Sequence, residues 1–269
     1  MLGRYDSTCL CVSLACLWGS TAAGTEKTLD LALVLAVDVW SSMTTAEQSL
    51  QRSGFIEAFR SPAVHKAIAK GTLGRIAVVY VEWSGADDQI ALVPWTVIDG
   101  PEAAWSFADK LGRKSMRRGG MTSISGVIGF SRTLFVDLDE EPVRRVIDIS
   151  GDGPNNDGSK VKYMRDHAVA EGITINGLPI QLHGAVSAWD LADLDGYYMD
   201  CVIGGPGSFM IPLDRADQFP SVIKAKILRE IAGGDGGASL FLPTGLQADC
   251  LSGEKRRKEE EALGGEGNP

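Results

Sequence analysis

The chain has 269 residues, of which 44% are hydrophobic and 23% are charged, a composition typical of a globular protein with a sizeable core. Its formal net charge is -9 at pH 7, and its Lys and Arg residues are spread along the chain instead of forming a stripe with aromatic residues. This charge pattern excludes nucleic acids and anionic membrane surfaces as expected partners.

The N-terminus has the pattern of a signal peptide. An apolar run over residues 9–18 follows Arg4 and precedes the small residues Thr21 and Ala23. The pattern predicts a signal peptide over residues 1–23, cleaved after Ala23, and therefore a periplasmic or secreted protein. A buried N-terminal strand or helix is the alternative. No other stretch is long and apolar enough for a transmembrane helix, so no membrane span is expected.

Two cysteines, Cys201 and Cys250, remain beyond this leader. Thiols in an oxidising compartment can pair. Cys250 adjoins a charged tail, however, so a disulfide and two free thiols both stay open. Residues 234–269 are predicted to form a C-terminal extension, and from about Ser252 we expect disorder or a frayed helix, because this tail has almost nothing to bury.

Hydrophobic patterning predicts the elements of the fold in chain order. Residues 31–37 are apolar without interruption, which indicates a central parallel strand covered on both faces. The short loop before residues 89–95 makes that strand antiparallel to its predecessor, and Pro94 places it at a sheet edge. Further strand patterns lie at 75–83, 143–150 and 173–181, and helix patterns lie at 46–59, 62–68, 101–111, about 122–136, 160–171, 188–195 and 214–231.

This alternation of strands and helices predicts an α/β fold over residues 28–233. The expected architecture is a doubly wound three-layer α/β/α sandwich, with a mostly parallel sheet and one antiparallel edge strand. A glycine-rich stretch over residues 202–212 is expected to lead into or out of a last short strand.

Side chains with oxygen ligands lie where the predicted strands end. Asp38 and Ser42 follow the first strand, Thr122 begins a helix, and Asp152 follows the strand that ends at Ser150. The carboxyl ends of strands are where open α/β sheets bind ligands. Oxygen donors without sulfur or imidazole suit Mg²⁺, Ca²⁺ or Mn²⁺ better than zinc or copper. For any one of these residues alone, capping the next helix is the simpler role.

The order of these motifs resembles a von Willebrand factor type A domain. The metal-ion-dependent adhesion site of that family has Asp-x-Ser-x-Ser, a loop Thr and a strand-end Asp where this chain has Asp38, Ser42, Thr122 and Asp152. The segments Tyr-Val-Glu-Trp-Ser, Ser-Gly-Asp-Gly-Pro-Asn-Asn, Ile-Thr-Ile-Asn-Gly-Leu-Pro-Ile and Cys-Val-Ile-Gly-Gly-Pro-Gly further resemble a bacterial family of exported, uncharacterised proteins with such a domain. The resemblance implies the fold and the location, and it implies no activity.

Trp40 departs from the adhesion motif, because it stands where the first serine would be. An indole donates through its N–H and has no oxygen lone pair, so one direct ligand is lost. Ser41 could replace that ligand only if the loop twisted by one residue. We therefore expect a degenerate metal site held by the four remaining residues.

Three functions stay open. The first is a non-enzymatic binding module for an unknown protein or peptide, in which an acidic side chain of the partner completes the shell of a bound cation. The second is a divalent-metal-dependent hydrolase that uses Asp38 and Asp152, and the third is a metal-free structural or interaction protein in which Trp40 plugs the site. The chain has no Gly-x-Ser-x-Gly elbow, and no spacing joins its three histidines, which favours a binding module over an enzyme.

Overall fold

The computed structural model describes residues 26–40, 42–182, 191–233 and 247–264. The predicted signal peptide over residues 1–23 therefore lies outside the described residues, as do Ser41 and most of the first half of the predicted C-terminal extension. In the described part of the chain, no helix is long and apolar enough to cross a membrane.

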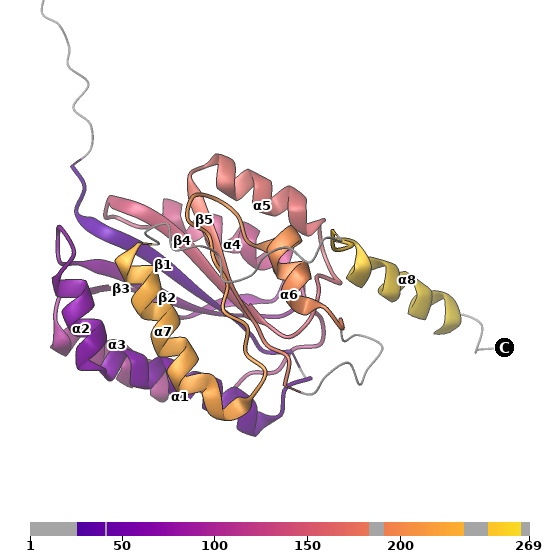
Figure 1. Ribbon diagram of the computed structural model, residues 1–269, viewed down its shortest axis with the longest axis horizontal. Helices are drawn as coiled ribbons and strands as arrows, with labels where there is room; N and C mark the ends of the chain where they lie inside the picture. Colours follow the sequence, from indigo (N-terminus) through magenta and orange to yellow (C-terminus); the bar gives the residue numbers. More distant parts are fainter. Residues whose placement is uncertain (1–25, 41, 183–190, 234–246, 265–269) are drawn as a thin grey trace, which may run out of the picture.

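A five-stranded sheet with the order β3-β2-β1-β4-β5 forms the middle layer (Figure 1). Strands β2, β1, β4 and β5 are mutually parallel, and β3 runs antiparallel to β2 at the sheet edge. This arrangement confirms the predicted mostly parallel sheet and the edge position of the strand that contains Pro94. The strands are β1 (Leu29–Asp38), β2 (Ile76–Trp83), β3 (Gln89–Ile98), β4 (Pro142–Gly151) and β5 (Ile173–Pro179).

Helices cover both faces of the sheet, as the prediction of three layers requires. The apolar run of β1 explains this, because its odd-numbered residues from 31 to 37 pack in one core and its even-numbered residues from 32 to 36 pack in the other. The first core contains α1 (Thr45–Arg60), α2 (Pro62–Ala69), α3 (Pro101–Gly112) and α7 (Phe219–Ala232). The second contains α4 (Ile124–Val136), α5 (Val161–Ala170) and α6 (Leu194–Tyr197), which continues into the π-helix η1 (Tyr198–Val202).

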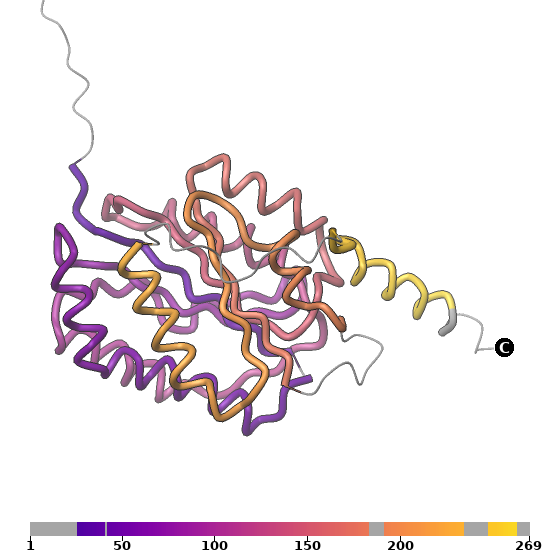
Figure 2. Tube along the Cα trace, in the orientation of Figure 1, coloured from indigo at the N-terminus to yellow at the C-terminus, as the bar shows by residue number. Residues whose placement is uncertain are grey.

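Three segments differ from the sequence predictions. The helix expected over residues 188–195 begins only at Leu194, and residues 188–190 lie outside the described part. The helix expected from Asp214 starts as a short 3-10 turn, and α7 itself begins at Phe219, one residue before Pro220. In place of a last strand, residues 203–213 run beside β5 and touch it through isolated bridges at Gly204, Met210 and Leu213 (Figure 2).

The C-terminal segment forms a helix, which is one of the two outcomes, disorder or a frayed helix, that the sequence predicted. Helix α8 (Ser252–Gly264) projects from the body of the protein (Figure 1). Its first turns lie against the fold, and its later residues carry mostly charged side chains. Just before it, Cys250 forms a disulfide with Cys201, so the two cysteines pair.

Candidate functional site

The two strand-end carboxylates meet because their strands are neighbours. Asp38 is the last residue of β1, Asp152 directly follows β4, and the register pairs Val37 with Ser150. Asp38 is 1% exposed, and its Oδ1 accepts a hydrogen bond of 2.9 Å from the backbone N–H of Trp40. Burial raises the pKa of Asp38 well above its ordinary value, and the charge of Asp152 raises it further.

Ser42 joins this pair from the loop that follows β1. Its hydroxyl is exposed and donates a hydrogen bond to Oδ2 of Asp152. Neither Ser42 nor Asp38 caps the next helix, because Thr44 forms a complete capping box with Glu47 at the start of α1. The capping role that was the simpler interpretation of Asp38 and Ser42 is therefore wrong.

Thr122, the fourth predicted residue, has its hydroxyl near Gly153, the residue after Asp152, and does not cap a helix either. The N-cap of α4 is Ser123, whose side chain accepts from the N–H of Gly126. The backbone of Thr122 is held on both sides by Asn156, which accepts from its N–H at 2.9 Å and donates to its carbonyl at 2.8 Å. Thr122 itself is fully buried, so the fold fixes a hydroxyl at this position.

Two oxygens of this group are buried without a hydrogen-bond partner among the described residues. They are Oδ2 of Asp38 and Oγ1 of Thr122. Buried polar atoms normally find a partner, since leaving one unpaired costs about 1–3 kcal/mol. A hard divalent cation accepts such carboxylate and hydroxyl oxygens as ligands, so the donor set fits one. Across the described residues, no group of three or more His, Cys, Asp or Glu side chains is placed to hold a metal.

Trp40 lies beside this group of oxygens. A Cβ built on Gly153 would lie 3.9 Å from Oγ1 of Thr122 and 3.9 Å from Cζ3 of Trp40. The indole and the threonine hydroxyl therefore face the same glycine. The backbone of Trp40 pairs with Gly119 and orients Asp38, and this backbone role needs no particular side chain.

Sequence reasoning missed the residues that hold the group in place. Asn155 and Asn156 are both buried, and their side chains accept hydrogen bonds from backbone N–H groups at the start of α4. The hydroxyl of Tyr198 is buried and has no hydrogen-bond partner in the part of the chain that the structure describes, and a Cβ on Gly151 would lie 2.9 Å from it and 3.1 Å from Oδ2 of Asp38. Two adjacent asparagines after a strand-end Gly-Asp-Gly were the available signal, whereas nothing in the sequence points to Tyr198.

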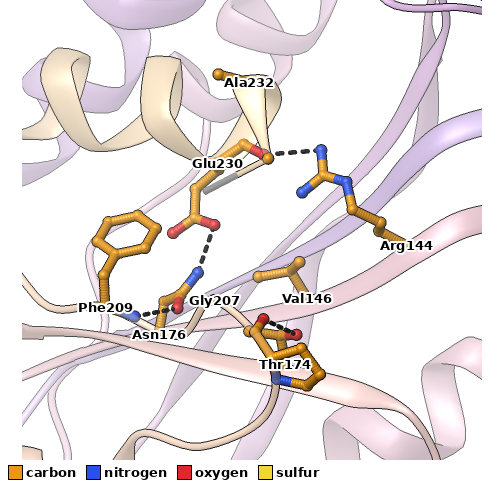
Figure 3. A pocket seen from close by; sticks show the side chains of 10 residues that line it. Arg144, Val146, Thr174, Asn176, Gly207, Phe209, Glu230 and Ala232 are labelled. Atoms are coloured by element: carbon orange, nitrogen blue, oxygen red, sulfur yellow. Dashed lines mark hydrogen bonds between the residues drawn. The ribbon is translucent and has the colours of Figure 1, made fainter. Parts of the chain in front are cut away.

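A second polar region lies under α7, around a cavity of about 420 Å³ (Figure 3). Nζ of Lys226 lies 2.9 Å from Oδ1 of Asp148 and 2.9 Å from Oε1 of Glu230, and Asn176 donates to Oε2 of Glu230 at 2.6 Å. We call these four residues the α7 cluster. Figure 3 shows the side chains of Glu230 and Asn176 pointing toward each other at the cavity wall. The carboxylates of the α7 cluster are paired with the ammonium group of Lys226, so this cluster stabilises the fold without offering free ligands.

Solved structures share the fold of this chain. Proximal thread matrix protein 1 from the mussel byssus is 13% identical with a TM-score of 0.56, over 77% of this chain and 48% of its own. A pilus adhesin, SpaC, from Lactobacillus rhamnosus GG is 13% identical with a TM-score of 0.55, over 78% and 31%. A von Willebrand factor type A protein from Catenulispora acidiphila is 11% identical with a TM-score of 0.52, over 76% and 43%.

These likenesses establish a von Willebrand factor A-like fold, and the chain spans about half or less of each of those proteins. One structure of the mussel protein has a zinc-occupied MIDAS motif, the metal-ion-dependent adhesion site. No curated protein matches the chain. A family model described as a protein of unknown function (DUF1194) matches residues 28–235, and the chain therefore belongs to that family.

Proposed function

We propose that this protein is a non-enzymatic, exported binding module that recognises a protein or peptide at the carboxyl edge of its sheet. The observation that supports the proposal is that Asp38, Asp152 and Ser42 lie together at this edge, with Oδ2 of Asp38 buried without a partner among the described residues, as is Oγ1 of Thr122 near Gly153. Such a group suits Mg²⁺, Ca²⁺ or Mn²⁺.

A bound cation would supply a positive centre that an acidic side chain of the partner can ligate. In this chain, Asp38 and Asp152 would balance its charge, and the hydroxyls of Ser42 and Thr122 would add neutral oxygen ligands. Two of the proteins with a similar fold, a thread matrix protein and a pilus adhesin, support binding over catalysis. The zinc-occupied MIDAS of the mussel protein supports a cation at this edge.

Calorimetric titration of the purified protein with Mg²⁺, Ca²⁺ and Mn²⁺ tests the proposal. We expect one ion per chain, and loss of at least tenfold in affinity in Asp152→Ala, since this change removes a charged ligand. Glu171→Ala is the matched control, because Glu171 is an exposed carboxylate that pairs with Arg132 on another surface. Equal ion binding by all three proteins would place the ion elsewhere and contradict the proposal.

A metal-free binding module is the second candidate, and the position of Trp40 favours it. The indole stands beside the hydroxyl of Thr122, where it can fill the space that a cation and its ligand would need. In that case the natural chain binds no divalent ion, and Trp40→Ser gains binding because it restores an oxygen and removes the ring. Binding by the natural chain that is unchanged in Trp40→Ser would rule this candidate out.

A further inference from the structure

The segment from Cys250 to Arg257 is fastened to the domain just beside the candidate site. The disulfide joins Cys250 to Cys201 of η1, and the N–H of Ala248 donates to Oδ2 of Asp200 at 2.7 Å. Both anchors lie on the π-helix that also carries Tyr198, whose hydroxyl lies near Asp38. The start of α8 is thus fixed to the same part of the fold as the site.

The first turn of α8 packs directly on the loop that follows Asp152. Oε1 of Glu254 accepts a hydrogen bond of 2.9 Å from Nδ2 of Asn155. Gly253 comes so close that a Cβ on it would lie 2.1 Å from the carbonyl oxygen of Asn155. One turn later, Arg257 pairs with Asp157 at 2.5 Å. A larger residue at position 253 would therefore push the helix away from the loop.

The same asparagine connects α8 to the start of α4. Oδ1 of Asn155 accepts from the N–H of Ser125 at 2.9 Å, while its Nδ2 is held by Glu254 and by the carbonyl of Ser159. Its neighbour Asn156 holds both backbone groups of Thr122. A continuous path therefore runs from Glu254 through Asn155 and its neighbour Asn156 to the backbone of Thr122, which positions the threonine side chain.

We propose that the disulfide-anchored start of α8 is a positioning element of the candidate site, and that the affinity of the site for a divalent cation depends on the contact of Glu254 and Gly253 with Asn155. This inference rests on the proposed function, because it assigns a positioning element to the same site. Residues that orient metal ligands without touching the metal typically contribute 10–100-fold to affinity. Glu254 acts here through Asn155, so it is a positioning residue and not a ligand.

Four variants of the full chain test this inference by titration with Mn²⁺. Glu254→Ala is expected to lower the affinity about tenfold, and Gly253→Ala should do the same by steric displacement of the helix. Glu254→Gln should bind as the natural chain does, because its amide oxygen still accepts from Asn155. Glu259→Ala is the matched control, since Glu259 is an exposed carboxylate on the same helix. An unchanged affinity in both Glu254→Ala and Gly253→Ala would overturn the inference.

Hydrogen exchange of the ion-free proteins separates this inference from the proposed function. The amides of Thr122 and Ser125 donate to Asn156 and Asn155, so both should exchange at least fivefold faster in Glu254→Ala and at the natural rate in Glu254→Gln. If the natural chain binds no ion, the proposed function fails, and the exchange rates still decide whether α8 positions the loop. Unchanged exchange at both amides would then reject the positioning role.

Discussion

The candidate site and the α7 cluster both bury carboxylates, and they differ in what faces those carboxylates. In the α7 cluster, Lys226 lies between Asp148 and Glu230, so a cation of the chain itself balances two buried acids. In the candidate site, Asp38 faces another acid, Asp152, and burial together with that charge raises the pKa of Asp38. The acids of the α7 cluster thus face a lysine, whereas Asp38 faces a second acid.

This difference indicates what each region contributes. A buried charge group that is fully paired holds the fold in one arrangement, and breaking it leaves an uncompensated charge in the core. At the candidate site, Oδ2 of Asp38 is instead buried without a hydrogen-bond partner among the described residues, and the nearby charge of Asp152 adds to the cost of ionising Asp38. Removing a charge should therefore have opposite effects in the two regions.

The largest effect is expected from Lys226→Met. The change leaves Asp148 and Glu230 buried side by side without a cation, which should lower the free energy of unfolding by about 3–5 kcal/mol. Urea denaturation measures it. Lys224→Met on the exposed side of α7 is the control and should change stability by less than about 0.5 kcal/mol. A loss below about 1 kcal/mol in Lys226→Met would show that the cluster is not tightly coupled.

The pH dependence of stability should report the same cluster. Burial raises the pKa of Glu230 from 4.5 to about 7, although Lys226 opposes this shift. Between these values the folded protein holds a proton that the unfolded chain releases, so stability is highest below pH 4.5 and falls as the pH rises through 7. A shift of this size corresponds to about 3 kcal/mol.

Urea denaturation between pH 4 and pH 8 measures how the free energy of unfolding changes with pH. The variant Glu230→Gln shows how much of that change is due to Glu230. The variant is less stable at every pH, because one of the donors Asn176 and Lys226 loses its acceptor. Its stability should nevertheless fall less steeply with pH. The residual slope belongs to other buried acids such as Asp148, whose pKa is also raised by burial. Equal slopes in the two proteins would assign the dependence to those acids alone.

Most of the fold could be predicted from the sequence, because the pattern of apolar residues indicates which strands are central. The unbroken run in β1 and the position of Pro94 predicted the middle and the edge of the sheet. The failures lie where tertiary contacts override local pattern. Residues 203–213 pair with residues 175–180 only through isolated bridges and form no strand. The disulfide and the polar contacts that place the start of α8 are likewise not revealed by any periodicity.

The site was predicted in part for a similar reason. Residues at strand ends come together by topology alone, so Asp38 and Asp152 were predictable from their positions after β1 and β4. Their supporting residues were not, because Asn155 and Glu254 are far apart in sequence and interact only in the folded chain. The ion pair of Asp148 with Lys226 was not predictable either, because these two residues are also far apart in sequence.

Asp38→Asn should raise stability where Lys226→Met lowers it. At pH 8 without divalent ions, the variant removes a buried acid that faces the charge of Asp152 and keeps an oxygen for the N–H of Trp40, so we expect a gain of about 2 kcal/mol in the free energy of unfolding. Added Mn²⁺ should stabilise the natural chain and not the variant. A variant that is less stable than the natural chain in ion-free buffer would mean that the site is already balanced by the protein.

The smallest effects are expected from removing either of two neighbouring hydroxyls before α4, those of Thr122 and Ser123. Thr122→Val removes a buried hydroxyl that has no partner among the described residues and keeps the shape of the side chain, so it should stabilise the ion-free protein by about 1 kcal/mol. Ser123→Ala is the matched control with the opposite sign. That hydroxyl accepts from Gly126 and donates to the carbonyl of Asp157, and its loss should cost about 1 kcal/mol.

Thermal denaturation with and without Mn²⁺ measures both variants. Thr122→Val should lose the stabilisation by Mn²⁺ that Ser123→Ala retains, because only the threonine hydroxyl belongs to the group of candidate ligands. If both variants lose stability equally and respond equally to the ion, then Thr122 is an ordinary structural hydroxyl. In that case the cation, if one binds, is held by the acids alone, and the contrast between the two regions rests entirely on Asp38 and Asp152.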